Sequence, residues 1–358
     1  MKLDATRRTV RTLWRVIGRL IFAEDEGRVS ARPDKLGKSM QDASPDEKGP
    51  EGLEQQPADL PPFVNVFDGL AEIQIKRIYE DVVIPTSLFH YTSAPGLIGI
   101  LGEHKLWFSD AAFMNDGSEV VYGVEVAAYA IREFVEDKTD AEKNAGSYLI
   151  DQIADAMRHY QPIIFCMSAR NNLLNQWRDY GKDVVPYCIE FNAAELENWQ
   201  SRNFPHFLTK IVYDAHFQKD LTISLVKDIY DRAIAIKGER EAFDEEESKR
   251  LAIGAAMEIA KLITRFKNWA FEAEEEYRAV CYRPDIEATV SPKYRASSLG
   301  VVPYYEWAGK DGPLPLPVLS VTVGPSPYAT VSDLALKQFL ADQGYDVPTY
   351  YSKIPIRR

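Results

Sequence analysis

The sequence is poor in the residues that build metal sites and disulfide frameworks. It has 3 cysteines and 5 histidines among 358 residues, with no CxxC or HExxH spacing. The cysteines, Cys166, Cys188 and Cys281, each lie in an apolar, strand-like run. An odd number of cysteines in such runs indicates buried thiols in a reducing compartment rather than disulfides. We therefore expect a cytoplasmic protein without a bound metal.

Positive charge and long apolar runs are also scarce. The formal net charge is -12, which argues against a general nucleic-acid-binding surface but not against a local basic groove. No uninterrupted apolar run is long enough to span a bilayer. The chain does have ample material for a core, with 46% hydrophobic residues, 16 Phe, 19 Tyr and 6 Trp. This content excludes wholesale disorder and predicts one large or two ordinary domains.

The first sixty or so residues differ in composition from the rest. Residues 1–23 are predicted to form a basic amphipathic helix, because apolar residues recur at helical spacing between arginines. Residues 24–62 are rich in Asp, Glu, Lys, Gly, Pro and Ser, as is typical of a disordered linker. Residues 63–358 are expected to form a single domain. The helix offers a contact for a membrane surface or a protein through residues 1–22, or is a non-essential extension.

Strand and helix patterns mix in residues 63–358 without regular βαβ alternation, which favours an α+β fold over a doubly wound sheet. No GxGxxG or Walker motif is present, so the two commonest nucleotide folds are not expected. Strands are predicted at 87–91, 106–109, 163–168, 186–191, 277–282, 300–307, 317–324 and 350–358. Helices are predicted at 64–81, 94–101, 120–134, 146–160, 221–236, 245–266 and 332–343, and a loop at 169–181.

Residues 271–282, FEAEEEYRAVCY, join a cluster of carboxylates to a strand. If the strand reaches back to Glu274, then Glu274, Glu276 and Arg278 share one face. Burying two carboxylates and a guanidinium is costly unless they pair or do chemistry. Two acids this close also repel each other, which raises the pKa of one. The segment marks either a catalytic acid pair or an exposed, salt-bridged strand end.

Two further candidates lie at the ends of predicted strands. His90 precedes a helix that Thr92 and Ser93 can cap, and the free amides at such a helix start form a natural anion site. The alternative is a histidine packed in the core. Ser168 ends a central strand where a loop begins, which is a favoured place for a site residue, or it only terminates the strand.

Polar and aromatic residues in the predicted turns complete the candidate set. Asn115, Asp116 and Glu119 form either a turn with a helix cap or part of a pocket rim. Trp177 and Tyr180, three residues apart, form either a stacking platform for a base or packing beneath their loop.

The order of these motifs resembles an uncharacterised bacterial family, domain of unknown function 2971. The match covers most of residues 86–357 and excludes the N-terminal helix and linker. The set of pieces is specific, although no single piece is. In chain order the pieces are LFHYT, GLIGIL, LWFSD, NDGSE, IIFCMS, QWRDYG, EEEYR, TVGP and SKIPIR.

The same order is similar to that of the ADP-ribosyltransferase fold, which implies a mixed, split β-sheet core flanked by helices. Such enzymes use a strand histidine to contact a ribose hydroxyl of NAD, an aromatic residue to stack on nicotinamide, and a later glutamate to assist glycosidic cleavage. The resemblance implies NAD as substrate, with His90 as the ribose contact. It implies Glu276 as the catalytic carboxylate and Glu274 as the accessory acid of an ExE pair.

The resemblance also implies the residues around NAD. Trp177 or Tyr180 would be the stacking aromatic. Arg278, beside the acids, would adjust their ionisation or bind a pyrophosphate. The other implied contacts are Tyr91, Thr92 and Ser168.

These observations favour an NAD-consuming, ADP-ribosyltransferase-like enzyme, either a toxin or a phage-defence effector. Its acceptor would be a protein, a nucleic acid or a small molecule. One alternative is a metal-dependent nuclease or hydrolase, although the sequence has no lysine beside ExE of the kind that many such nucleases require. It would use Asp110, Asp116, Glu119, Glu274 and Glu276. Another is a non-enzymatic module that senses a ligand or binds a partner.

Overall fold

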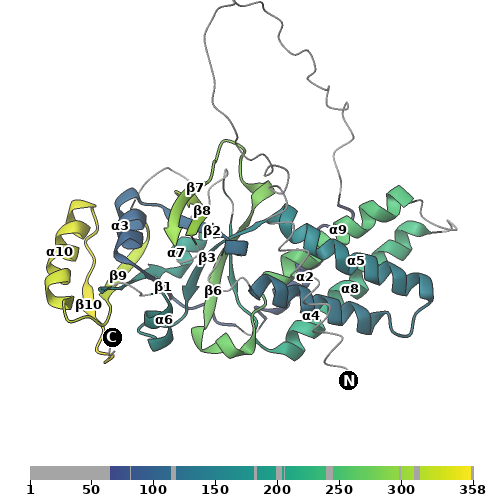
Figure 1. Cartoon of the computed structure of the whole chain (residues 1–358), viewed down its shortest axis with the longest axis horizontal. Coiled ribbons are helices and arrows are strands. Elements are labelled where there is room, and N and C mark those ends of the chain that lie inside the picture. Colours follow the sequence, from purple (N-terminus) through teal and green to yellow (C-terminus); the bar gives the residue numbers. More distant parts are fainter. Residues whose placement is uncertain are drawn as a thin grey trace, which may run out of the picture. The chain divides into compact units, whose positions relative to one another are not determined.

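The computed structural model describes residues 65–80, 82–113, 118–180, 184–198, 204, 206–238, 245–297, 300–309 and 315–355. The predicted basic helix, the whole of the predicted linker, and the turn residues Asn115 and Asp116 lie outside these ranges. The described part contains a mixed sheet with its own core and a cluster of helices with a second core (Figure 1). The predicted α+β class, with a sheet flanked by helices, is confirmed.

The sheet has ten strands in the described part of the chain. Its main path runs β10-β9-β4-β1-β3-β2-β8-β7, while β6 pairs with β3 and β5 pairs with β6. All of these pairs are antiparallel except β9 and β10. The strands are β1 (Ser87–Thr92), β2 (Leu106–Asp110), β3 (Pro162–Ser168), β4 (Tyr187–Asn192), β5 (Phe207–Lys210), β6 (Glu276–Tyr282), β7 (Lys293–Ser297), β8 (Gly300–Trp307), β9 (Val318–Val323) and β10 (Thr349–Tyr351).

Three strands, β1, β2 and β6, pair with β3, and the sheet divides where β1 and β2 share one edge of it. One edge of β3 pairs with β6 along its whole length. The other edge pairs with β2 only at Ile163 and Ile164, and with β1 only at Ser168. Among the described strands, none pairs with residues 165–167 on that second edge. The sheet therefore opens between β1 and β2, as the predicted split sheet requires.

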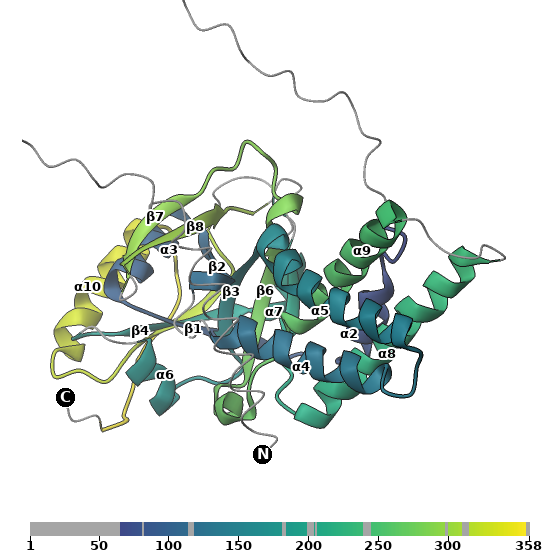
Figure 2. The ribbon, with the colours of Figure 1, turned by 45° about the vertical axis from the view of Figure 1, so that its right-hand side comes forward.

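The helices form two groups. Figures 1 and 2 both show α2, α4, α5, α8 and α9 gathered on one side of the sheet, with α3 and α10 at its opposite end. The first group comprises α2 (Leu70–Arg77), α4 (Ser118–Phe134), α5 (Asp140–Tyr160), α8 (Ala215–Lys237) and α9 (Glu245–Ile263). The others are α3 (Ala94–Glu103), α6 (Leu174–Asp179), α7 (Ala193–Asn198) and α10 (Ala329–Asp342), with short 3-10 helices η1 (Ala111–Phe113), η2 (Trp269–Glu274) and η3 (Arg283–Asp285). In the described residues, each helix is too short or too polar to cross a membrane.

Local sequence explains most of these elements. The β3 strand is apolar on both faces because it lies between two neighbours within the sheet, and six of its seven residues are buried. The α5 helix begins at a capping box in which Thr139 and Glu142 bond reciprocally. The α3 helix begins at Ser93, whose hydroxyl accepts from the amide of Gly96 as the sequence predicted. The three cysteines are free, and Cys166 alone is only partly buried because it borders the opening.

Four short helices and strands were not predicted, and the strand at 277–282 does not extend back to Glu274. The predicted loop at 169–181 contains α6, and β5, β7 and α7 were also missed. The extension of the acidic strand to Glu274 is wrong, because η2 ends there and β6 starts at Glu276. The C-terminal strand is an edge strand as predicted, but β10 covers only Thr349–Tyr351.

Gly324, just after β9, lies against the rings of Pro186 and of Trp177 in α6, so a larger residue here would press on both rings. A Cβ there would lie 2.6 Å from Pro186 Cγ and 2.7 Å from Trp177 Cζ3, well inside van der Waals contact. We expect Gly324→Ala to lower the free energy of unfolding by about 1–3 kcal/mol, because both rings must shift. Urea unfolding followed by circular dichroism measures this change.

Gly102, in the last turn of α3, provides the matched control. A Cβ there would meet only Phe339, at 3.8 Å. We expect Gly102→Ala to leave the free energy of unfolding unchanged or to raise it by up to about 1 kcal/mol, since alanine favours the helix. Equal losses in the two variants would contradict the close packing at Gly324.

Candidate functional site

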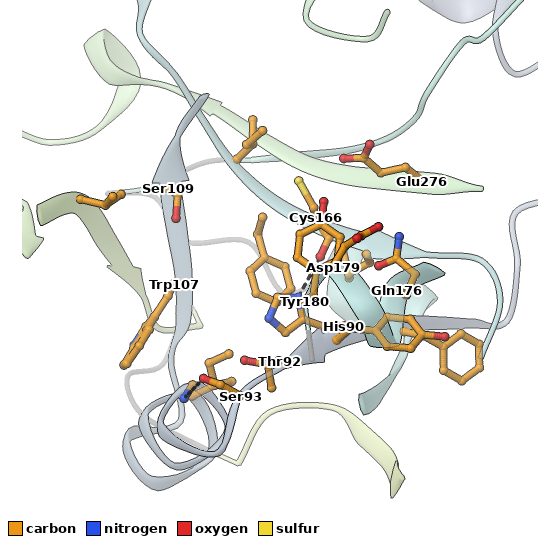
Figure 3. Close-up of a pocket in the computed structure, with 18 of the residues that line it drawn as sticks. His90, Thr92, Ser93, Trp107, Ser109, Cys166, Gln176, Asp179, Tyr180 and Glu276 are labelled. Atoms are coloured by element: carbon orange, nitrogen blue, oxygen red, sulfur yellow. Dashed lines mark hydrogen bonds between the residues drawn. The ribbon is translucent and has the colours of Figure 1, made fainter. Parts of the chain in front are cut away.

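A pocket of about 340 Å³ opens where β1 and β2 separate along β3. Figure 3 shows its lining, with side chains from β1, β2 and β3, the short helix α6 and the start of β6. Aromatic and polar groups share the wall, as is common in small-molecule sites. Its polar and ionisable lining residues include His90, Thr92, Ser93, Trp107, Ser109, Cys166, Gln176, Asp179, Tyr180, Glu274, Glu276 and Arg295.

His90 lies in the opening itself. Its Nδ1 is 2.8 Å from the carbonyl oxygen of Cys166, in the stretch of β3 that has no strand partner on this edge (Figure 3). Its ring stacks on Phe165 with centroids 4.3 Å apart. Because a carbonyl can only accept, Nδ1 carries a proton and donates, which leaves Nε2 as an acceptor. Burial lowers the pKa of His90 to about 4, against the opposing effect of the Cys166 carbonyl.

Four buried charged side chains and the partly buried Glu119 form a network at the other side of the pocket. Arg278 donates to both oxygens of Glu276, at 2.6 Å from Nε and 3.0 Å from Nη2, and also pairs with Glu119. The Lys267 ammonium joins three carboxylates, lying 2.8 Å from Glu119, 2.7 Å from Glu274 and 2.9 Å from Glu276. Three acids thus face two bases, which leaves the network with one formal negative charge when all five ionise.

In this network the pKa values of the two acids of the ExE pair shift in opposite directions. Burial opposes ionisation of Glu276, but Arg278 and Lys267 outweigh it and lower the pKa of Glu276 to about 2. Burial raises the pKa of Glu274 above its ordinary value, even though Lys267 acts in the opposite direction. Glu276 is therefore a permanent anion, and Glu274 is the weaker acid. The expectation that one member of the pair has a raised pKa is met by Glu274.

A tight turn, not a common strand face, brings Glu274 and Glu276 together. Between them Glu275 adopts a left-handed conformation with φ of 44°, so its side chain points to the surface and pairs with Arg170 at 2.9 Å. The backbone amide of Glu276 donates to the Tyr213 hydroxyl at 2.9 Å. Glu274 and Glu276 therefore do not share a strand face; instead, both side chains contact Lys267.

The two predicted stacking aromatics are placed differently. Tyr180, at the end of α6, lines the pocket. Trp177 is 1% exposed, lies outside the pocket lining, and packs edge-on against Tyr91 with centroids 4.8 Å apart. The Tyr91 hydroxyl donates to the Arg170 carbonyl and accepts from the Leu173 amide, so it fixes the loop that leads into α6. Tyr91 and Trp177 thus support the wall from which Tyr180 projects.

Several other predicted residues do not line the pocket. The Ser168 hydroxyl is used internally, donating 2.7 Å to the carbonyl of Glu274. Arg278 is 4% exposed and lies behind Glu276. Asp110 accepts from the amide of Ala112 and caps η1 instead. Glu119 belongs to the charged network rather than to a rim.

The start of α3 does not provide the predicted anion site. The Gly96 amide donates to the Ser93 hydroxyl at 3.2 Å, and the Leu97 amide to the Ser93 carbonyl at 2.9 Å. Pro95 has no N–H to offer. The first-turn amides of these three residues are therefore unavailable to a ligand, whereas Thr92 and Ser93 still contribute side chains to the pocket.

Two basic residues of the site were not predicted. Although the sequence has no lysine directly beside ExE, Lys267 contacts both acids in the folded protein after the chain returns through η2. Lys267 lies seven residues before Glu274, and this proximity was a usable signal. Arg295 lines the pocket from β7, but the surrounding sequence KYRAS resembles any exposed strand and gave no signal.

Within the described residues, no group of three or more His, Cys, Asp or Glu side chains is arranged to hold a metal ion. A metal at Glu119, Glu274 and Glu276 would have to displace the Lys267 ammonium, which contacts all three.

A family model described as protein of unknown function (DUF2971) matches residues 176–279 of the chain. The predicted resemblance to this family is confirmed over that stretch, which includes most of α6 and the residues Lys267, Glu274 and Glu276. No curated protein and no solved structure matches the chain. The resemblance to the ADP-ribosyltransferase fold stays a prediction.

Loss of one network member should be costly. We expect Glu276→Gln to lower the free energy of unfolding by about 3 kcal/mol, because Arg278 and Lys267 lose a buried counter-charge. Glu275→Gln is the matched control, since its partner Arg170 is exposed, and we expect a loss below about 1 kcal/mol. Urea unfolding at pH 7 measures both variants, and similar losses would refute a buried network.

His90 should make the protein sensitive to mild acid. Its pKa is about 4 in the folded protein against 6.5 for an ordinary histidine, so the unfolded state binds the proton first. The free energy of unfolding should therefore fall as the pH drops from 6.5 towards 4, and His90→Asn should make this fall smaller. Urea titrations at pH 7 and pH 4.5 measure the difference.

A His90→Asn protein that loses as much stability as the wild type between pH 7 and pH 4.5 would contradict a neutral His90 in the folded protein.

Proposed function

We propose that the pocket binds NAD and that the protein is an NAD-consuming, ADP-ribosyltransferase-like enzyme. The observation that carries this proposal is that one pocket is lined by His90 from β1, Tyr180 from the end of α6 and Glu276 from β6. These are the residue types that the fold uses for the ribose, the nicotinamide and the glycosidic bond.

Glu276 has the properties of a charge stabiliser. Cleavage of the nicotinamide–ribose bond develops positive charge on the sugar. A carboxylate with a pKa of about 2 is ionised throughout the physiological range. Arg278 and Lys267 hold it in a fixed orientation before any substrate binds, so little reorganisation is needed during the reaction.

Glu274 is the better proton acceptor. In the proposed reaction the bond between ribose C1′ and the nicotinamide nitrogen breaks, and nicotinamide leaves with the bonding electrons. An acceptor hydroxyl or water attacks C1′ and must lose a proton. The raised pKa of Glu274 brings it closer to neutral pH, where a carboxylate takes up protons most effectively. Such general-base assistance contributes about 10²–10⁴ in rate.

His90 and Tyr180 would position the substrate. The neutral His90 ring has Nε2 as an acceptor, which suits a ribose hydroxyl. Tyr180 presents an aromatic ring at the pocket wall, which suits stacking on nicotinamide. Neither role needs a charged side chain.

The wider biological role follows from the chemistry. An enzyme that consumes NAD, or that modifies a protein, nucleic acid or small-molecule acceptor, can act as a toxin or a phage-defence effector. Such an enzyme would work in the cytoplasm, where NAD is available.

A non-enzymatic ligand-binding module is the second candidate. It is favoured by one observation: both oxygens of Glu276 already accept hydrogen bonds from Arg278, and one also pairs with Lys267. A carboxylate so fully engaged can serve a purely structural purpose. The pocket would then bind its ligand without cleaving it.

Release of nicotinamide from NAD tests the proposal. We expect the full-length protein to release it, with the product identified by chromatography and mass spectrometry. Glu276→Gln and Glu274→Gln should each reduce the rate by about a hundredfold or more. Glu275→Gln should retain the wild-type rate, because its side chain lies outside the pocket.

Circular dichroism at the assay temperature separates lost chemistry from lost folding in the Glu276→Gln protein. NAD binding without nicotinamide release would favour the ligand-binding module. Activity abolished by a chelator and restored by a divalent ion would favour the metal-dependent hydrolase. A wild-type protein that neither binds nor cleaves NAD would sink the proposal.

A further inference from the structure

The partly buried Arg295 differs from the buried bases Lys267 and Arg278 in its lack of an acidic partner. Its Nη2 donates to the Ser109 hydroxyl at 2.8 Å, while its Nε is buried without a hydrogen-bond partner among the described residues. None of the described carboxylates forms an ion pair with it. Arg278 and Lys267, in contrast, each contact two or more glutamates.

This arrangement carries a cost in desolvation. Burial lowers the pKa of Arg295, and only the Tyr304 hydroxyl opposes that effect. The guanidinium lies 6.0 Å from the Tyr304 ring, which compensates weakly for lost hydration. A partly buried cation with one hydroxyl partner is stabilised most by an anion that brings oxygen acceptors.

The neighbouring wall offers further hydrogen-bond donors. Ser109 is 3% exposed, and because its oxygen accepts from Arg295, its own proton can be donated to a ligand. Trp107 lies two residues earlier on β2, so both side chains face the same side of the strand. Its indole Nε1 is also buried without a partner in the described structure. In Figure 3, His90 lies between these two β2 residues and Glu276.

The other anion sites suggested by the sequence are already occupied. Arg278 is committed to Glu276 and Glu119, and the amides of Gly96 and Leu97 at the start of α3 are bonded to Ser93. Of the described residues that line the pocket, Arg295 is the one with a permanent positive charge. The pocket thus has a cationic wall at β2 and β7 and an anionic wall at Glu274 and Glu276.

We propose that Arg295 and Ser109 form a subsite for the phosphate or diphosphate of the pocket's ligand. The subsite would orient that ligand, with its phosphates on the guanidinium and its sugar, where positive charge develops, towards Glu276. The identity of the ligand as NAD rests on the function proposed above. The anion subsite itself requires only a phosphate-bearing ligand, whether a nucleotide or a free diphosphate.

Calorimetric titration of the full-length protein with three probes tests the subsite. We expect ADP-ribose to bind at low salt, and Arg295→Met to weaken it by about tenfold or more, since charge-assisted arginine–phosphate contacts are strong. Adenosine, which has no phosphate, should bind both proteins equally weakly. Inorganic pyrophosphate should compete with ADP-ribose on the wild type, but not on Arg295→Met.

Lys293→Met is the matched control on the same strand. It also removes one positive charge from β7, but Lys293 pairs with Glu306 and does not line the pocket. We expect it to change ADP-ribose affinity by less than about twofold, because exposed charges act weakly at this range. Arg295→Met should melt at the same temperature as the wild type or higher, because it removes a poorly compensated charge.

The outcomes separate this inference from the proposed enzyme activity. Unchanged ADP-ribose affinity in Arg295→Met, or equal losses in Arg295→Met and Lys293→Met, would overturn the subsite even if the wild type cleaves NAD. Failure of both ADP-ribose and pyrophosphate to bind the wild type would also overturn it. A selective loss in Arg295→Met would support the subsite even if no nicotinamide is released.

Discussion

The divided pairing of β3 is the constraint on which the pocket depends. Its edge opposite β6 is shared by β1 and β2, which hold it at its two ends and leave the middle open. A backbone carbonyl left in such a gap needs a hydrogen-bond donor, and His90 supplies one to Cys166. The same bond fixes the tautomer of the imidazole, while burial keeps the ring neutral. The opening therefore determines both where His90 lies and what it can do.

The charged network links this opening to the helices. Glu119 comes from α4 and Lys267 follows α9, while Glu276 and Arg278 belong to β6. One set of ion pairs thus joins the helical cluster to the sheet and sets the ionisation of the acids at the pocket. Because buried ion pairs contribute more to specific positioning than to net stability, we regard the network chiefly as a device that fixes Glu276.

The sequence was sufficient where elements are long or strongly patterned. The buried strands β3, β4 and β6 and the long helices were predicted, because apolar periodicity persists over many residues. The elements α6 and β5, with 6 and 4 residues, are too short to show a period. Motif resemblance found His90, Tyr180 and Glu276, but it could not tell which of Trp177 and Tyr180 faces the pocket, because that depends on the direction of a helix the pattern did not reveal. The role of Arg295 could not be predicted from the sequence, because it depends on the absence of an acidic side chain beside it in the folded protein.

The unequal distribution of acids and bases around the pocket is easier to explain by ligand binding than by side-chain packing alone. A network that only satisfied a buried strand would balance its acids and bases, yet three glutamates face two bases beside the pocket, and the pKa of Glu274 rises as a result of burial. At the opposite wall Arg295 has no acid at all. Each imbalance costs free energy. A direct ion pair between Arg295 and the glutamates would remove both costs, but these side chains line different walls of the cavity. A ligand with an anionic end and a cationic or proton-donating end relieves both imbalances at once, which is why the pocket is better explained by such a ligand than by the fold alone.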